Sequence, residues 1–169
     1  MGDEPLLISQ HMPMTPCFVG ENRISALEKI KVHHPALEWV LLDDAFQHRP
    51  LQPQLSLLLT RWNKPYFEDQ LWPVGNLRDI PKAANRAHAL VVTSTPREVS
   101  VLELESKRKK IALHFKGPIF FAQTLYLEPR PLFPENDVEI QSPVGAFCGI
   151  AQPEPFFQYV HQLLDLEKK

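Results

Sequence analysis

The sequence has few glycines and few cysteines: six and two among 169 residues, against 17 prolines. The phosphate-cradling motif GxxxxGK[ST] occurs nowhere in it. The two cysteines, Cys17 and Cys148, lie far apart and lack metal-ligand spacing, which argues against a disulfide scaffold and a cysteine-based zinc site. We interpret both as reduced, buried thiols of a cytosolic protein. The many prolines indicate stiff turns and few long helices.

Long apolar runs and an excess of one charge are also missing. No run approaches the roughly 18–20 apolar residues of a membrane span, and no signal-peptide pattern opens the chain. The net charge of −2 gives no general attraction to nucleic acid, so we expect no such partner, and any phosphate binding must come from a local cluster of cations. With 44% hydrophobic and 22% charged residues, the composition is that of a globular protein of one domain, or of one domain plus part of another.

The central feature of the sequence is the apolar run WVLL at residues 39–42, followed at once by Asp43 and Asp44. Such a run predicts a strand buried on both faces of a parallel sheet, with both carboxylates at its carboxyl end, where open α/β sheets bind ligands. In phosphate-transfer enzymes an acidic residue at this place helps to hold Mg²⁺. The alternative is a strand that runs into a solvated acidic turn.

The residues that follow the two aspartates favour a binding role. They place four different functional groups in one turn: the aromatic ring of Phe46, the amide of Gln47, the imidazole of His48 and the guanidinium group of Arg49. We call residues 43–49 the DDAFQHR turn. Side chains of these kinds can hold a metal and an anionic substrate together, because carboxylates bind Mg²⁺ and guanidinium groups bind phosphate.

The remaining chain alternates predicted helices with predicted strands. Helices are expected at residues 4–11, 23–32 (with Asn22 as the N-cap), 80–87 and 98–110, and in the segment after Pro153. Strands are expected at residues 17–19, 55–59, 89–93 and 144–150, with an extended segment at 118–128. This alternation predicts an α/β fold with a mostly parallel sheet. The basic run 107–110 is interpreted as a solvated helix end, with contact to an anionic membrane surface as the alternative.

Six stretches together resemble the tetraacyldisaccharide 4′-kinase family, the lipid A 4′-kinases of Gram-negative bacteria. They are GDEPLLI at residues 2–8, GENR at 20–23, DDAFQHR at 43–49, LWPVGNLRD at 71–79, RAHALVVT at 86–93 and AFCGIAQPEPFF at 146–157. Their order and spacing match the family along nearly the whole chain.

The resemblance implies an atypical P-loop kinase. Such an enzyme uses ATP and Mg²⁺ to phosphorylate the 4′-hydroxyl of tetraacyldisaccharide 1-phosphate, a lipid A precursor. In the family an N-terminal hydrophobic helix docks the enzyme on the cytoplasmic face of the bacterial inner membrane. The implied architecture is a partial P-loop-kinase-like α/β/α sandwich with a Walker B-like strand at residues 1–116, a linker at 117–137 that includes a strand, and the start of a second α/β domain at 138–169.

The resemblance also implies catalytic and cofactor-binding residues. Asp3 aligns with the general base toward the sugar hydroxyl, and His48 matches the histidine of the DDAFQHR turn and is expected to be catalytic too. Asp43 and Asp44 match the Walker B pair and are expected to hold Mg²⁺ and the nucleotide. Gln47 is expected to share in cofactor binding. The alternatives are structural: Asp3 as a helix cap and His48 as a hydrogen-bonding partner within the fold.

Substrate contacts are implied at four further residues. Arg23 and Arg78 match basic residues that meet phosphates, a role that suits the bidentate fork of a guanidinium group. Glu4 and Asn76 are expected to bind substrate beside them. For Arg78 a structural hydrogen bond is the alternative.

The chain departs from the family in what it lacks. In the family the phosphate-cradling loop lies upstream of GDEP, and the histidine that partners the base lies in the second domain, so we expect this chain to be an internal fragment of a kinase. Ala45 replaces a usual glycine, which would be awkward if its φ were positive, and Asp79 replaces a common glutamate. The alternative is a self-standing, non-catalytic α/β module that keeps a phosphosugar-binding surface.

Overall fold

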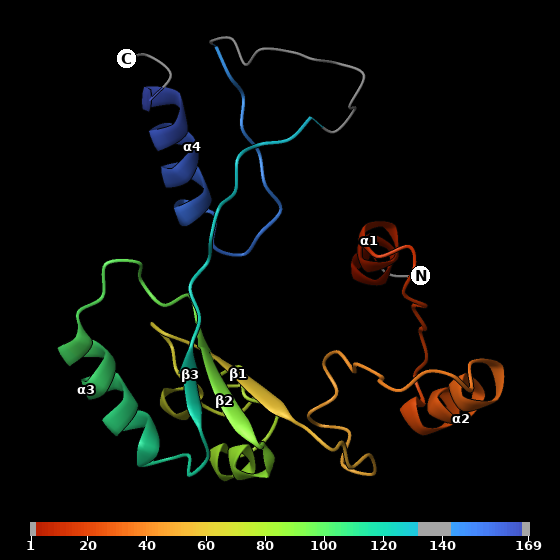
Figure 1. The fold of residues 1–169 in the computed structure, drawn as a ribbon. Coiled ribbons are helices and arrows are strands. Elements are labelled where there is room, and N and C mark those ends of the chain that lie inside the picture. The colour runs from red at the N-terminus through yellow and green to blue at the C-terminus, as the bar shows by residue number, and fades with distance from the viewer. Residues whose placement is uncertain (1–2, 132–142, 167–169) are drawn as a thin grey trace. The chain divides into compact units, whose positions relative to one another are not determined.

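The computed structural model describes residues 3–131 and 143–166, and it divides the chain into two compact units that meet between Gln123 and Thr124 (Figure 1). The sheet and all nine predicted site residues belong to the first unit. Each unit is described by itself. The expected domain boundaries stay a prediction.

Two helices occupy the beginning of the first unit, α1 (Asp3–His11) and α2 (Arg23–His33). The side chain of Asn22 accepts a hydrogen bond from the Ser25 amide at 3.1 Å and thereby caps α2. Both helices and the cap are confirmed. The strand expected at residues 17–19 is wrong: this segment is irregular, and the Phe18 ring packs edge-on against His34 with 5.3 Å between ring centroids.

Three short strands form a parallel sheet in the order β1 (Leu57–Arg61), β2 (Ala89–Thr93), β3 (Ile119–Phe121). β2 has the predicted bounds, β1 begins two residues later than expected, and β3 lies inside the expected extended segment. Leu59 lies opposite Val91, which lies opposite Phe120. The α/β class with a parallel sheet is therefore confirmed.

The connections between the strands are helical, as parallel pairing requires. β1 and β2 are joined through two 3₁₀ helices, η1 (Tyr66–Glu68) and η2 (Pro81–Arg86), and β2 and β3 through α3 (Val101–Ala112). η2 replaces the α-helix expected at residues 80–87, because its bonds span three residues, as in Ala83 N–H to Ile80 carbonyl at 2.8 Å. α3 begins at a capping box in which Ser100 and Glu103 bond reciprocally.

The hydrophobic core covers one face of the sheet. Leu90 and Val92 of β2 are fully buried there, together with Ile111 of α3 and with Phe115 behind it. Figure 1 shows α3 running beside the strands. Phe46 of the DDAFQHR turn packs against the same core, which ties the predicted site to the sheet.

The opposite face of the sheet is apolar and open among the described residues. Side chains alternate between the two faces of a strand, so the neighbours of the core residues point the other way. Leu59 is 65% exposed and Phe120 is 56% exposed, and Val91 lies between them in the register. A row of apolar side chains thus crosses all three strands on this face.

Two predicted strands are wrong. Residues 39–42 are irregular rather than a buried strand, and Leu41 is 92% exposed; residues 144–150 are also irregular, and Phe147 is 93% exposed. An apolar run indicates a tendency to be buried but does not specify a partner, and a strand forms only when a neighbour bonds its amides. Among the described residues, the strand ladders join only β1, β2 and β3.

The second unit contains α4 (Glu154–Leu166), which confirms the helix expected after Pro153. The Tyr159 hydroxyl donates to the Leu127 carbonyl at 2.7 Å, and its ring stacks on Tyr126 at 4.8 Å. Part of the expected linker and of the expected second domain, residues 132–142, lies outside the described residues. The two cysteines, expected to be buried, are free and half-buried. No described helix combines the length and the apolar character that crossing a bilayer needs.

Candidate functional site

The DDAFQHR turn is held by short-range hydrogen bonds and by its own phenylalanine. The His48 amide donates to the Ala45 carbonyl at 3.0 Å, and the Arg49 amide donates to the Gln47 carbonyl at 2.9 Å. The one positive φ of the turn, 45°, falls at Asp44 rather than at Ala45. Aspartate tolerates this left-handed conformation better than most residues. Alanine at position 45 therefore needs no glycine-like backbone.

A second structured segment, residues 69–80, contains the GNLRD loop (residues 75–79). Asp69 fastens its base: the carboxylate accepts from the Gln70 amide at 2.9 Å and from the Asn76 side chain at 3.3 Å. The same carboxylate forms an ion pair with Lys64 at 3.0 Å. A side chain at Gly75 would collide with the Gln70 carbonyl oxygen, so this close approach requires glycine.

The bonds to Asp69 alter its acidity. The Lys64 ammonium, followed by the Gln70 amide, lowers the pKa of Asp69 from 3.8 to about 2. A pKa that is lower in the folded chain means that the charged carboxylate stabilises the fold. This contribution is fully present above pH 3.8 and is lost as the pH falls toward about 2.

We therefore expect Asp69→Asn to flatten the acid dependence of stability. The free energy of unfolding of the parent chain should fall between about pH 4 and pH 2, and the variant should lose less over the same interval. Urea unfolding followed by tryptophan fluorescence measures both. Glu28→Gln, at an exposed carboxylate of α2, is the control for removal of one charge. Equal losses in the parent and in Asp69→Asn would contradict the assignment.

Asp79 joins the GNLRD loop to the DDAFQHR turn. Its carboxylate oxygens lie 3.2 and 3.1 Å from the Arg49 Nη2 atom, and one of them also accepts from Arg86 Nη1 at 3.1 Å. The Ile80 amide donates to the other oxygen at 2.9 Å. These donors, with Arg86 first, lower the pKa of Asp79 below its ordinary value. Its side chain is only 17% exposed.

Arg86 completes this connection from η2. Its Nη2 atom donates to the Phe46 carbonyl at 3.3 Å, and its guanidinium group lies 4.8 Å from the centroid of the Phe46 ring. A cation over an aromatic face is a favourable contact. The turn, the loop and η2 thus meet around the Asp79 carboxylate.

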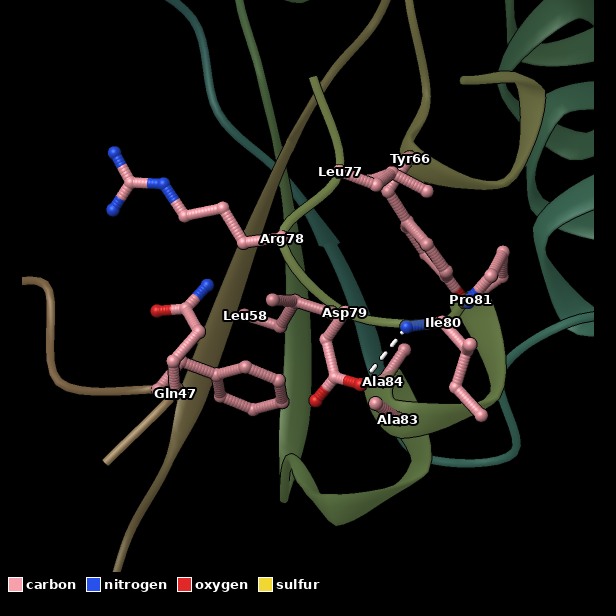
Figure 2. Close-up of a pocket in the computed structure, with 11 residues that line it drawn as sticks. Gln47, Leu58, Tyr66, Leu77, Arg78, Asp79, Ile80, Pro81, Ala83 and Ala84 are labelled. Atoms are coloured by element: carbon pink, nitrogen blue, oxygen red, sulfur yellow. Dashed lines mark hydrogen bonds between the residues drawn. The ribbon is translucent and has the colours of Figure 1, made fainter. Parts of the chain in front are cut away.

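Beside this connection lies a second, more open ion pair. Arg78 Nη1 is 3.4 Å from Asp44 Oδ2, and both side chains are 71% exposed. In Figure 2 the Arg78 side chain extends to the left of the loop, and the Asp79 side chain points downward. Both residues and Gln47 line a cavity of 70 Å³, whose other walls come from Phe46, Leu58, Tyr66, Leu77, Ile80, Pro81, Ala83 and Ala84. Arg78 also borders a larger cavity of 490 Å³ with Leu71, Trp72 and Leu77.

The structure brings some of the predicted site residues together. Asp44, Gln47 and Arg78 meet around the ion pair and the smaller cavity. The Nε2 atom of His48 is buried and has no hydrogen-bond partner among the described residues. Asn76 bonds to Asp69, and Asp43 is exposed.

The other predicted residues lie on the N-terminal helices. Asp3 is the first residue of α1, and Glu4 follows it with an exposed side chain. Arg23, at the start of α2, donates to the carbonyls of Gly20 and Glu21 at 3.1 and 3.0 Å. Among the described residues, no hydrogen bond or ion pair joins Glu4 or Arg23 to the DDAFQHR turn.

The residues of the turn fit Mg²⁺ in part. The described residues contain no cluster of three or more acidic, histidine or cysteine side chains that could hold a metal alone. Mg²⁺ is usually bound by one or two carboxylates together with waters and substrate phosphates, so it does not need such a cluster. Asp43 and Asp44 carry oxygen atoms of the kind that Mg²⁺ prefers, and beside Asp44 lies the Arg78 guanidinium group, which is of the kind that binds phosphate.

Sequence reasoning did not single out Asp79 and Arg86 as the centre of this arrangement. The available signal was weak: an Arg-Asp pair at the end of the GNLRD loop, followed by an arginine seven residues after the aspartate. Seven-residue spacing carries no meaning in a 3₁₀ segment that follows a loop. The contact with Arg49, 30 residues away, had no sequence signal at all.

Comparison with known proteins yields consistent matches. A sequence model of the family described as tetraacyldisaccharide-1-P 4′-kinase matches residues 1–167. The tetraacyldisaccharide 4′-kinase of Bacteroides thetaiotaomicron is 32% identical over 179 residues, covering 98% of this chain and 47% of that protein. The protein of the same name from Flavobacterium johnsoniae is 33% identical, with 95% and 48% covered. The chain spans about half the length of the curated relatives it matches. No solved structure matches it.

Proposed function

Since the chain belongs to the tetraacyldisaccharide-1-P 4′-kinase family, we propose that it is the middle part of a kinase that phosphorylates the 4′-hydroxyl of tetraacyldisaccharide 1-phosphate with ATP and Mg²⁺. The phosphate-cradling loop and the remainder of the second domain belong to other parts of that enzyme. We call this chain together with those parts the complete kinase.

One observation carries the proposal beyond family membership: Asp44 and Arg78 belong to different motifs and are 34 residues apart in the sequence, yet their charged groups lie 3.4 Å apart. A carboxylate suited to Mg²⁺ and a guanidinium group suited to phosphate are therefore presented at the same place. Phosphoryl transfer requires such positioning and charge neutralisation more than covalent chemistry.

Asp43 and Asp44 hold the metal, and Gln47 contributes to the cofactor side of the same cavity. When bound, Mg²⁺ neutralises charge on the transferred phosphoryl group. Arg78 binds phosphate oxygens through its exposed guanidinium group, and Arg23 and Asn76 contribute further substrate contacts. To bind phosphate, Arg78 must exchange its contact with Asp44 for contacts with the ligand. This exchange costs little free energy, because both side chains of the pair are exposed.

The proton of the acceptor hydroxyl goes to Asp3, with Glu4 beside it as a substrate contact. His48 acts within the DDAFQHR turn, where its Nε2 atom is buried and has no partner among the described residues. A buried polar atom without a partner is costly, so a movement of the turn that brings this atom to a ligand would also satisfy it.

The finer architecture is also a proposal. We infer a partial P-loop-kinase-like α/β/α sandwich at residues 1–116, a linker at 117–137 and the start of a second domain at 138–169. The open apolar row through Leu59, Val91 and Phe120 supports a further layer on that face, because parallel sheets have both faces covered.

The complete kinase works at the cytoplasmic face of the inner membrane. The support is chemical: its tetraacylated substrate is a membrane lipid, and a kinase must reach the headgroup from the side that supplies ATP. The basic end of α3 carries Lys109 and Lys110 with exposed side chains, which suits an anionic surface nearby.

The test of this function begins with the DNA on both sides of the coding segment, where an in-frame GxxxxGK[ST] motif is expected upstream. The complete kinase should then convert ATP and tetraacyldisaccharide 1-phosphate to the 4′-phosphorylated product, and removal of Mg²⁺ should abolish turnover. The chain alone should give no product above a no-enzyme control, because Asp43 and Asp44 cannot replace the phosphate-cradling loop.

Two outcomes would contradict the proposal. Product from the chain alone would show that no separate loop is needed. A reading frame without the motif, or a folded complete kinase without activity, would favour the alternative of a non-catalytic phosphosugar-binding module. Binding of the disaccharide 1-phosphate to the chain without turnover would then be the observation to seek.

A further inference from the structure

The DDAFQHR turn and the GNLRD loop carry complementary charges in matching order. Asp44 and Arg49 on the turn face Arg78 and Asp79, which are adjacent on the loop. Each segment thus offers one acid and one base to the other. The carboxylates of the two ion pairs differ greatly in their surroundings, because Asp79 is 17% exposed and Asp44 is 71% exposed, whereas Arg49 and Arg78 are 68% and 71% exposed.

The ion pair between Asp44 and Arg78, called the outer pair below, cannot fix its own geometry. Asp44 and Arg78 are each 71% exposed, and they meet through a single contact of 3.4 Å. Exposed ion pairs of this kind contribute little to order, because water screens the charges and both long side chains keep their rotamer freedom. Some other contact must hold Arg78 beside the turn.

The ion pair between Asp79 and Arg49, called the inner pair below, has a less exposed carboxylate with more hydrogen-bond donors. Asp79 is 17% exposed, and its carboxylate receives hydrogen bonds from Arg49, Arg86 and the Ile80 amide at 2.9–3.2 Å. A carboxylate with several charged donors forms a network whose geometry is more restricted than that of an isolated pair. Arg86 extends this network to Phe46, which packs against the core of the sheet.

We propose that Asp79 is a positioning residue: by binding Arg49 and Arg86 it fixes the GNLRD loop against the DDAFQHR turn and so holds Arg78 beside Asp44. This rests on the proposed function, in which Arg78 binds phosphate and Asp44 binds Mg²⁺. The Asp79 carboxylate is engaged by Arg49, Arg86 and the Ile80 amide. Its effect is transmitted through one peptide unit to the neighbouring arginine.

Two substitutions at position 79 separate charge from shape. Asp79→Asn keeps the size of the side chain and the bond from the Ile80 amide, but it loses the charge and turns an amide donor toward the two arginines. Asp79→Glu keeps the charge with one more methylene group, so it can still reach both guanidinium groups. We expect glutamate, but not asparagine, to retain the position of Arg78.

The experiment measures kcat and KM of the complete kinase together with the melting temperature. We expect Asp79→Asn to raise KM for the disaccharide 1-phosphate and to lower kcat/KM by roughly 10-fold or more, and Asp79→Glu to recover most of this loss. Arg49→Gln removes the inner pair from the other side and should change the same parameters in the same direction. It keeps the test open if Asp79→Asn does not fold.

The matched control is Glu103→Gln, which removes a carboxylate from the capping box of α3 and leaves the two loops intact. It should lower the melting temperature without raising KM. If Asp79→Asn and Arg49→Gln keep normal kinetics, or change only in proportion to lost stability as Glu103→Gln does, the positioning role is overturned. An inactive parent enzyme would overturn the proposed function instead, so the two failures are distinguishable.

Discussion

Replacement of Asp3 by asparagine in the complete kinase is expected to lower kcat by about 10²–10⁴-fold with almost no change in the melting temperature. Asp3 is the first residue of α1, a place where aspartate also serves as a helix-end residue. Asparagine serves a helix start about as well as aspartate, but it cannot accept a proton at neutral pH. The substitution therefore removes the proposed general base and leaves the helix in place.

The measurement is steady-state kinetics beside thermal unfolding of the same samples. Glu4→Gln, at the next residue of α1, is the matched control for loss of one negative charge at the helix start. Because Glu4 is expected to contact substrate, its variant should act mainly on KM. An unchanged kcat in Asp3→Asn would leave only the structural role and would remove the base from the mechanism.

The second large effect concerns the metal. Asp43→Asn and Asp44→Asn are each expected to lower kcat/KM by roughly 10²–10³-fold, since each removes one of the proposed charged oxygen ligands while hardly changing side-chain volume. Raised Mg²⁺ should recover part of the loss if the defect lies in metal affinity. Near-normal turnover of both variants at saturating Mg²⁺ would refute the assignment.

The result for Asp44→Asn is harder to interpret than that for Asp43→Asn, because Asp44 also forms an ion pair with Arg78. Asp44→Asn also breaks that pair, whereas Asp43→Asn does not. Arg78→Gln provides the comparison: it removes the pair and a phosphate contact but leaves both carboxylates. If only Asp44→Asn and Arg78→Gln were impaired, and by equal factors without recovery in Mg²⁺, the pair rather than the metal would account for the result.

Local patterns in this sequence predicted local structure well. Asn22 ahead of an apolar helical stretch predicted the start of α2, and the apolar run at residues 89–93 predicted β2 with its observed bounds. Both signals lie within a few residues of the structure they specify. A cap needs an amide three residues away, and β2 lies at the centre of the sheet with a partner on each side.

Structure that depends on a partner far away in the sequence was predicted wrongly or was not predicted at all. The run at residues 39–42 is as apolar as β2, yet it has no strand beside it among the described residues. The motif at residues 43–49 predicted a functional role for Asp44, but it did not predict that Arg78 would be its neighbour. Asp79 drew attention only as a departure from glutamate, although its carboxylate meets an arginine 30 residues away. Such contacts follow from chain topology, which no local window contains.

The order in which the protein folds follows from where the site residues lie along the chain. β1 and β2 are parallel neighbours, so the whole of residues 62–88, including Arg78, Asp79 and Arg86, lies in the connection that must close before they pair. Closing such a connection costs chain entropy before any strand contact repays it. The connection between β2 and β3, residues 94–118, has nearly the same length, but it carries Ile111 and Phe115, which are fully buried in the core. We therefore expect the two segments that carry Asp44 and Arg78 to be ordered in the last stage of folding, after β2, α3 and β3 have packed together.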